Sequence, residues 1–164
     1  MATDVRFRPA HPDDAERVAG IWRVGWADGH LGHVPEALVA VRTGDSFAAR
    51  AGQRIEDTTV LTVGGAVAGF VMVVDDEVEQ VYVAREHRGA GVAAALLAEA
   101  ERLVFDDGYD RAWLAVVAGN ARARRFYERN GWQDEGTFDY AAADENGPIP
   151  LTCHRYGKDV KSTR

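Results

Sequence analysis

Six small or charged residues, Arg88-Gly89-Ala90-Gly91-Val92-Ala93, lie between a predicted strand and a predicted helix. Glycine and alanine at such a turn let a ligand approach the backbone closely. No Ser, Thr, Asp or Asn is placed to cap the helix that begins after Gly91, so its first N–H groups need another partner. A phosphate is a natural candidate, because helix N-termini bind anions through free N–H groups and the helix dipole. The segment therefore indicates a phosphate-binding turn.

Three phosphate-binding motifs can be compared with this turn. The run Gly89-Ala90-Gly91-Val92-Ala93-Ala94 fits the dinucleotide pattern G-x-G-x-x-A, but the charged residues 84–88 separate the first glycine from the strand. The next predicted strand also ends, at Val116-Val117-Ala118, without the acidic residue that this motif needs. A P-loop is excluded, because the chain contains no Gly-Lys-Ser/Thr. The third pattern, Arg88-x-x-Gly91-x-Ala93, resembles the pyrophosphate-binding loop of the GNAT family of N-acetyltransferases. A glycine-rich turn without a ligand remains the alternative.

A second stretch resembles the other GNAT signature. It reads Asn120-x-x-Ala123-x-x-Phe126-Tyr127-x-x-x-Gly131-Trp132. Asn120 is a good N-cap residue and Gly131 a good residue to follow a helix, features that a helix without function would share. A helix without function does not explain why both stretches occur together and in this order. The resemblance covers about residues 58–132.

The resemblance implies a mechanism and a set of binding residues. Members of the family transfer an acetyl group from acetyl-CoA to a primary amine by direct attack, so neither a cysteine nucleophile nor a metal is needed. Backbone N–H groups around Val81–Val83 would hold the carbonyl oxygen of the thioester. The residues expected to contact acetyl-CoA are Val81, Tyr82, Val83, Arg88, Gly89, Ala90, Gly91, Val92, Ala93, Ala94, Asn120 and Tyr127.

Acetyl transfer also needs an acid and a base. The departing thiolate benefits from a proton donor, and a phenol with a pKa of about 10 remains protonated at pH 7. Tyr127 matches the motif position of the family's usual general acid, although it could instead be a tyrosine that faces the core. We therefore name Tyr127 as the candidate acid. A base is needed as well, because the acceptor ammonium must lose a proton before it attacks.

The candidate bases are two glutamates of one predicted strand. Glu77 lies where some relatives carry a catalytic glutamate, and Glu79 shares its face if the strand is unbulged. Both could instead be solvated strand residues. Ala115 lies where another branch of the family carries its base, which excludes that variant. If neither glutamate acts, the remaining candidates are His30, His33 and His154.

The acceptor pocket is expected near the N-terminus, because that region commonly forms its wall in the family. Ala15, Val18, Ala19 and Trp22 predict a helix, and Gly25, Gly29 and Gly32 are predicted to interrupt it. The alternative is that the tryptophans pack in the core and the histidines are inert surface residues. The substrate-side candidates are Trp22, Trp26, Asp28, His30 and His33.

The remaining patterns predict the scaffold. Strands are expected at Val5–Arg8, Thr58–Val63, Ala66–Val74, Glu77–Val83 and Arg111–Val117, and a final hairpin at Trp132–Tyr140 and Leu151–Tyr156. Helices are expected after residues 11, 34, 46, 91 and 120. Because a helix connects Glu77–Val83 to Arg111–Val117, these two strands should be parallel. We predict one domain, residues 1–164, with a mixed α/β (α+β) fold: a GNAT-like, mostly antiparallel twisted sheet with one parallel strand pair and helices on both faces.

The composition of the chain limits the classes of molecule that it is expected to bind. Acidic residues outnumber basic ones, 26 to 19, and this disfavours a nucleic-acid partner while mildly favouring a cationic amine. The longest apolar run, residues 66–74, is too short to span a bilayer, and no signal peptide is evident, so a cytoplasmic protein is the default expectation. A single cysteine allows no intrachain disulfide. We expect acetyl-CoA and an amine as partners, with a homodimer as a further option.

Two alternatives to a small-amine acetyltransferase remain open. A protein N-terminus or lysine could be the acceptor, and an open groove would favour that reading over a narrow tunnel. A non-catalytic acyl-CoA-binding sensor would keep the glycine turn but could lose the acid and the base. The presence of Tyr127 argues against the sensor.

Overall fold

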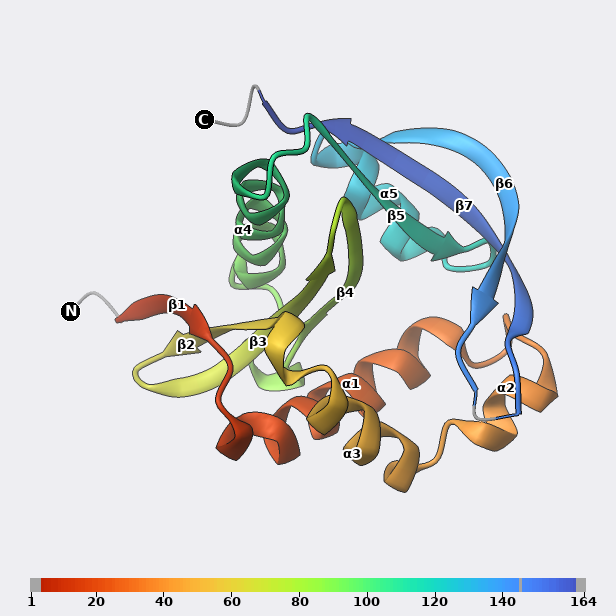
Figure 1. Ribbon diagram of the computed structural model, residues 1–164, viewed down its shortest axis with the longest axis horizontal. Coiled ribbons are helices and arrows are strands. Elements are labelled where there is room, and N and C mark those ends of the chain that lie inside the picture. Colours follow the sequence, from red (N-terminus) through yellow and green to blue (C-terminus); the bar gives the residue numbers. More distant parts are fainter. Residues whose placement is uncertain (1–3, 145, 162–164) are drawn as a thin grey trace.

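Seven strands form one twisted sheet in the part of the chain that the computed structural model describes, residues 4–144 and 146–161 (Figure 1). The spatial order is β1-β2-β3-β4-β5-β7-β6, and every neighbouring pair is antiparallel except β4 and β5. The strands are β1 (Val5–Pro9), β2 (Thr58–Val63), β3 (Ala66–Val74), β4 (Glu77–Val83), β5 (Arg111–Val117), β6 (Gln133–Ala142) and β7 (Ile149–Asp159). The predicted fold class and the single parallel pair are confirmed.

Helices cover both faces of the sheet (Figure 1). The longer ones are α1 (Ala15–His30), α2 (Glu36–Val41), α3 (Gly44–Gln53), α4 (Val92–Asp106) and α5 (Ala121–Arg129). Three single turns of 3-10 helix are η1 (Pro12–Asp14), η2 (Ile55–Asp57) and η3 (Arg85–His87). No helix of the described residues is long and apolar enough to cross a membrane.

The sheet separates two apolar clusters, since side chains alternate across each strand. Phe70 of β3 packs with α1 and α3 residues such as Trp22 and Phe47, while the adjacent Val71 packs with Leu96 of α4. All five side chains are essentially inaccessible to solvent. Burial of large apolar side chains on both faces thus fixes the helices to the sheet.

The prediction that glycines interrupt α1 was wrong. The helix continues through Gly25 and Gly29 to His30, and only Gly32 has a positive φ, 85°. A Cβ atom at Gly25 would overlap the ring of Tyr82 in β4, and one at Gly29 would lie 2.8 Å from Nδ2 of Asn120. These two glycines therefore allow α1 to approach the sheet and α5 closely, rather than ending the helix.

A β-bulge interrupts the pairing of β4 with β3. Met72 of β3 is paired with Gln80, but Val73 is paired with Val78, so Glu79 is the extra residue on β4. The bulge reverses the alternation of side chains beyond it. The predicted bounds of this strand, Glu77–Val83, are confirmed. The condition under which Glu77 and Glu79 were expected to share a face, an unbulged strand, is not met.

Candidate active site

A cleft of about 990 Å³ opens where β4 and β5 diverge. The two strands are paired only at Glu77 and Trp113 in the described part of the chain. Beyond this pair, residues 80–82 of β4 and 115–117 of β5 line the cleft. The backbone of β4 that sequence analysis assigned to the thioester carbonyl therefore borders an open space on its β5 side.

The glycine turn adopts the conformation that its composition predicts. Gly89 and Gly91 have φ angles of 82° and 77°, in the left-handed region that favours glycine. Gly91 occupies the N-cap position of α4 and provides no side chain to cap it. A Cβ added at either glycine would meet nothing within 4 Å. The first N–H groups of α4 thus lack intrahelical acceptors, and the two glycine positions leave room beside the backbone, a suitable arrangement for an anion.

Asp28 lies next to the glycine turn and does not line the cleft. Its carboxylate forms ion pairs with Arg88 at 2.8 Å and with Arg85 at 3.3 Å. The hydrogen bond from Arg88 is the largest cause of a lowered pKa for Asp28. The structure therefore places Asp28 against the predicted phosphate-binding turn, and not among the residues that line the cleft.

Helix α5 presents Asn120 and Tyr127 to the cleft. The Asn120 side chain accepts a hydrogen bond of 3.2 Å from the N–H of Ala123, which confirms it as the N-cap. Gly131 has a φ of 88° after the helix, and the N–H of Trp132 donates to the Tyr127 carbonyl oxygen at 3.0 Å. These contacts fix both ends of α5, at the two positions where the sequence offered suitable cap residues.

The Tyr127 hydroxyl is a free proton donor. Burial raises the pKa of Tyr127 to about 12, so the phenol stays protonated over the neutral range. No residue of 4–144 or 146–161 forms a hydrogen bond with its oxygen. Tyr82, which lies close enough to be influenced by Tyr127, likewise has a pKa raised by burial. Both phenols are therefore neutral at pH 7.

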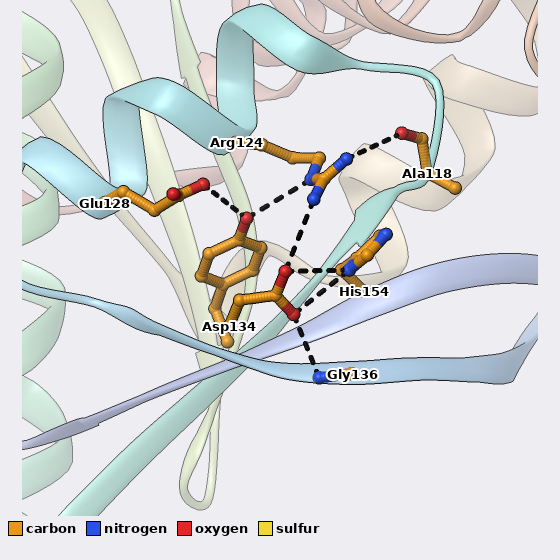
Figure 2. A network of polar contacts seen from close by, with 7 residues as sticks. Ala118, Arg124, Glu128, Asp134, Gly136 and His154 are labelled. Atoms are coloured by element: carbon orange, nitrogen blue, oxygen red, sulfur yellow. Dashed lines mark hydrogen bonds and ion pairs between the residues drawn. The ribbon is translucent and has the colours of Figure 1, made fainter.

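A polar network behind α5 holds the helix on the sheet (Figure 2). The Tyr156 hydroxyl donates to Glu128 at 2.8 Å and accepts from Arg124 at 3.3 Å. Arg124 also donates to Asp134 at 3.3 Å, and Asp134 contacts His154 at 3.0 Å. Because His154 is engaged in this network and does not line the cleft, it is not placed to act as the base.

Glu77 and Glu79 both line the cleft but have different partners. Arg54 binds Glu79 with two parallel hydrogen bonds of 2.8 Å, so the negative charge of Glu79 is balanced. Glu77 instead accepts a hydrogen bond of 2.7 Å from the Tyr140 hydroxyl. Burial is the largest cause of a raised pKa for Glu77, and the charge of Glu79 adds to it. The structure thus distinguishes two residues that the sequence left equivalent.

Of the four remaining substrate-side candidates, Trp26 and His30 line the cleft. Their rings stack with centroids 4.7 Å apart, and burial lowers the pKa of His30 to about 4, so this histidine is neutral at pH 7. Trp22 is fully buried in the core, and His33 lies against Gly119 outside the cleft. Neither Trp22 nor His33 lines the cleft: Trp22 packs in the core from α1, and His33 follows the end of that helix.

Several lining residues were not identified from sequence. Helices α2 and α3 and the β6–β7 hairpin contribute Arg42, Arg50, Arg54, Tyr140 and Asp144. The Arg42 side chain donates a 2.6 Å hydrogen bond to the carbonyl oxygen of Ala143, which joins the end of α2 to the hairpin. Figure 1 shows these two segments side by side. The i, i+4 spacing of Arg50 and Arg54 was the one local signal available.

Comparison with known proteins gives a consistent result. The model of the acetyltransferase (GNAT) family matches residues 35–132, which include the glycine turn and α5. An uncharacterised N-acetyltransferase of Mycobacterium tuberculosis is 31% identical over 123 residues, 68% of this chain and 79% of the relative. Streptothricin acetyltransferase of Streptomyces lavendulae is 29% identical over 158 residues, 77% of this chain and 80% of the relative. The crystal structure of PaiA N-acetyltransferase from Thermoplasma acidophilum in complex with coenzyme A has a TM-score of 0.68 and 18% identity, covering 95% and 99% of the two chains.

Proposed function

Because the chain belongs to the acetyltransferase (GNAT) family and is an acyl-CoA-dependent acetyltransferase, we propose that it transfers the acetyl group of acetyl-CoA directly to a small primary amine. The observation that carries this proposal is the cleft between β4 and β5, which brings together the free hydroxyl of Tyr127 and the carboxylate of Glu77. An acid and a base on one cavity meet the two proton transfers that aminolysis of a thioester requires.

Acetyl-CoA is the proposed acetyl donor. Its pyrophosphate would bind the N–H groups at the start of α4, where Gly89 and Gly91 leave the backbone open. Arg88 would add a charge-assisted hydrogen bond after leaving Asp28. Support comes from PaiA N-acetyltransferase, which shares this fold and was crystallised with coenzyme A.

In the proposed reaction each group has one task. Backbone N–H groups around Val81–Val83 hold the thioester oxygen as charge develops on it. Glu77 removes a proton from the acceptor ammonium, directly or through water, since its raised pKa makes it a better base than an ordinary carboxylate. Tyr127 protonates the departing thiolate. Glu79 keeps Arg54 in place and does not act as the base.

A small acceptor is favoured over a protein. The hydrogen bond from Arg42 to Ala143 links the end of α2 to the β6–β7 hairpin beside the cleft, where an extended peptide would need an open groove. The similarity to streptothricin acetyltransferase, named for a small molecule, points the same way. We also propose that residues 1–164 form a single domain, since one continuous sheet extends from β1 to β6.

The test is thiol release from acetyl-CoA with a panel of small amines, peptide N-termini and lysine-containing peptides, and mass spectrometry of the products. The proposal predicts turnover with small amines. Preferential acetylation of peptides would establish the protein-directed alternative. Binding of acetyl-CoA without turnover of any acceptor would instead support a sensor.

A further inference from the structure

Arg50 places a guanidinium group in the cleft, and one nitrogen of this group has no hydrogen-bond partner among the described residues. It projects from α3, lines the cleft, and stacks its guanidinium over the Trp22 ring at 4.4 Å from the ring centroid. Its Nη1 atom is buried and has no hydrogen-bond partner among the described residues. Burial is the main cause that lowers the pKa of Arg50 to about 10, so the side chain is still cationic at pH 7.

The other arginines of the cleft have partners. Arg54 forms ion pairs with Glu79 and Asp57. Arg42 donates to the carbonyl oxygen of Ala143. Arg50 forms no ion pair with any carboxylate of residues 4–144 and 146–161. Since a buried cation without a hydrogen-bonded anion is costly, the free protein lacks a group that the Arg50 site is suited to bind.

A second unsatisfied donor lies on the same stacked pair. Nε1 of Trp22 is also buried without a hydrogen-bond partner in the described structure. Indole and guanidinium nitrogens donate only, so neither can satisfy the other. A ligand that satisfies Arg50 must therefore offer acceptor oxygens and a negative charge. A carboxylate matches the planar fork of an arginine in both respects.

We propose that Arg50 binds a carboxylate of the acceptor, so that the acceptor is an amino acid or another small amine that carries a carboxylate. This inference rests on the proposed function. Glu77, on the same cleft, has Tyr140 rather than a cation as its partner. The cleft thus offers an unpaired anion for the ammonium and an unpaired cation for the carboxylate of one zwitterion.

The experiment compares each of the twenty amino acids with its α-carboxamide, as acceptors for acetyl-CoA. The two members of a pair differ in the charge that Arg50 would recognise and share the same side chain. Hydrogen bonds to charged groups contribute about 1.5–3 kcal/mol, so kcat/KM of the best acid should exceed that of its amide by about tenfold or more. Because the carboxylate does not change during transfer, the difference should appear in KM.

Two variants of Arg50 separate recognition from packing. Arg50→Gln removes the charge, and Arg50→Lys keeps a charge but loses the fork. The acid-over-amide preference should disappear in Arg50→Gln and shrink in Arg50→Lys, because turnover of the acid falls more than turnover of the amide. A merely structural arginine would lower both substrates equally. Arg6→Gln is the matched control, because Arg6 has a side chain 75% exposed on β1 and pairs with Asp4.

The outcomes are distinct. If amines without a carboxylate are acetylated as well as their acids, or if the preference survives Arg50→Gln, the Arg50 proposal is overturned. Either result leaves the acetyltransferase proposal intact. If no acceptor is acetylated, calorimetry with the CoA-saturated protein decides. Binding of an amino acid, but not its amide, that depends on Arg50 supports the carboxylate site while the proposed function fails. Absence of such binding overturns both.

Discussion

The hydroxyl of Tyr140 donates a hydrogen bond of 2.7 Å to Oε2 of Glu77. Strand β6 thereby supplies a neutral partner to a part-buried carboxylate of β4. This hydrogen bond lowers the pKa of Glu77, while burial, the larger effect, raises it. Glu79, two positions along the chain, has a cationic partner in Arg54 instead. The contrast between the two glutamates leads to the first two predictions.

Replacing Glu77 with glutamine should reduce kcat/KM by about 10²-fold at pH 7, where the acceptor is an ammonium that must lose a proton. The deficit should shrink at higher pH, because more acceptor is already neutral. Full pH–rate profiles measure both effects. Glu79→Gln is the matched comparison, and we expect its deficit not to depend on pH. A loss in Glu77→Gln that varies with salt rather than pH would show that the carboxylate only attracts a cation.

Replacing Tyr140 with phenylalanine removes a hydrogen bond that lowers the pKa of Glu77. The pKa of Glu77 should therefore rise further. Since the base works only when deprotonated, the acid limb of kcat/KM should move to higher pH, with little loss on the alkaline side. Stability should fall by about 1 kcal/mol. A limb that stays in place would exclude Glu77 as the group that it reports.

Tyr127→Phe tests the acid. The ring and its packing remain, and the hydroxyl has no hydrogen-bond partner among residues 4–144 and 146–161, so stability should hardly change. If Tyr127 protonates the thiolate, kcat should fall by about 10²-fold when chemistry limits turnover. Single-turnover kinetics measure this step. Tyr109→Phe, at an exposed tyrosine, is the control and should be fully active. An unchanged rate in Tyr127→Phe would make the residue structural.

Gly91→Glu tests the phosphate site. The substitution adds a negative charge where the pyrophosphate is expected, and calorimetry should detect no CoA binding. Left-handed backbone strain by itself costs about 1–2 kcal/mol for any other residue. Gly64→Glu, at a φ of 59° in the β2–β3 turn, introduces the same residue in a similar conformation away from the cleft. This control should bind CoA normally. Equal affinity in folded Gly91→Glu would reject the site.

Two alanine substitutions in α1 should have opposite effects on stability. A Cβ at Gly25 overlaps the Tyr82 ring, so Gly25→Ala should destabilise the protein by about 1–3 kcal/mol and disturb the cleft. A Cβ at Gly20 meets nothing within 4 Å, and Gly20→Ala should stabilise the helix by about 0.5–1 kcal/mol. Urea denaturation of both variants checks the pair. Equal effects would contradict the close contact between α1 and β4.

Local sequence signals were sufficient for much of the fold. The strands Thr58–Val63, Ala66–Val74 and Glu77–Val83 were predicted with their observed ends, because turn residues delimit each apolar run. The hairpin turn at Gly64-Gly65 has the positive φ angles that its composition predicts. The glycine turn before α4 and the caps of α5 could also be predicted from the sequence, since a capping residue and the backbone groups that it caps lie within one turn of helix.

These local signals could not predict contacts between residues far apart in the sequence. Gly25 has the same local effect in a helix whether or not Tyr82 lies beside it, so the sequence predicted a break where the structure has a close approach. The final hairpin was predicted as Trp132–Tyr140 and Leu151–Tyr156, but β7 is longer at both ends. Pairing with β6 extends its start, and pairing with β5 extends its end.

The sequence by itself determined the family, the order of the strands and helices, and the motif residues at the glycine turn and in α5, because each depends on residues close together in the chain. Only the tertiary structure decided which glutamate is paired with Arg54 and which with Tyr140, and that Trp22 supports Arg50 instead of facing the cleft. Those partners are 25 to 63 positions apart. A buried carboxylate or guanidinium acquires its pKa and its role from the groups that folding brings to it, and no local pattern records them.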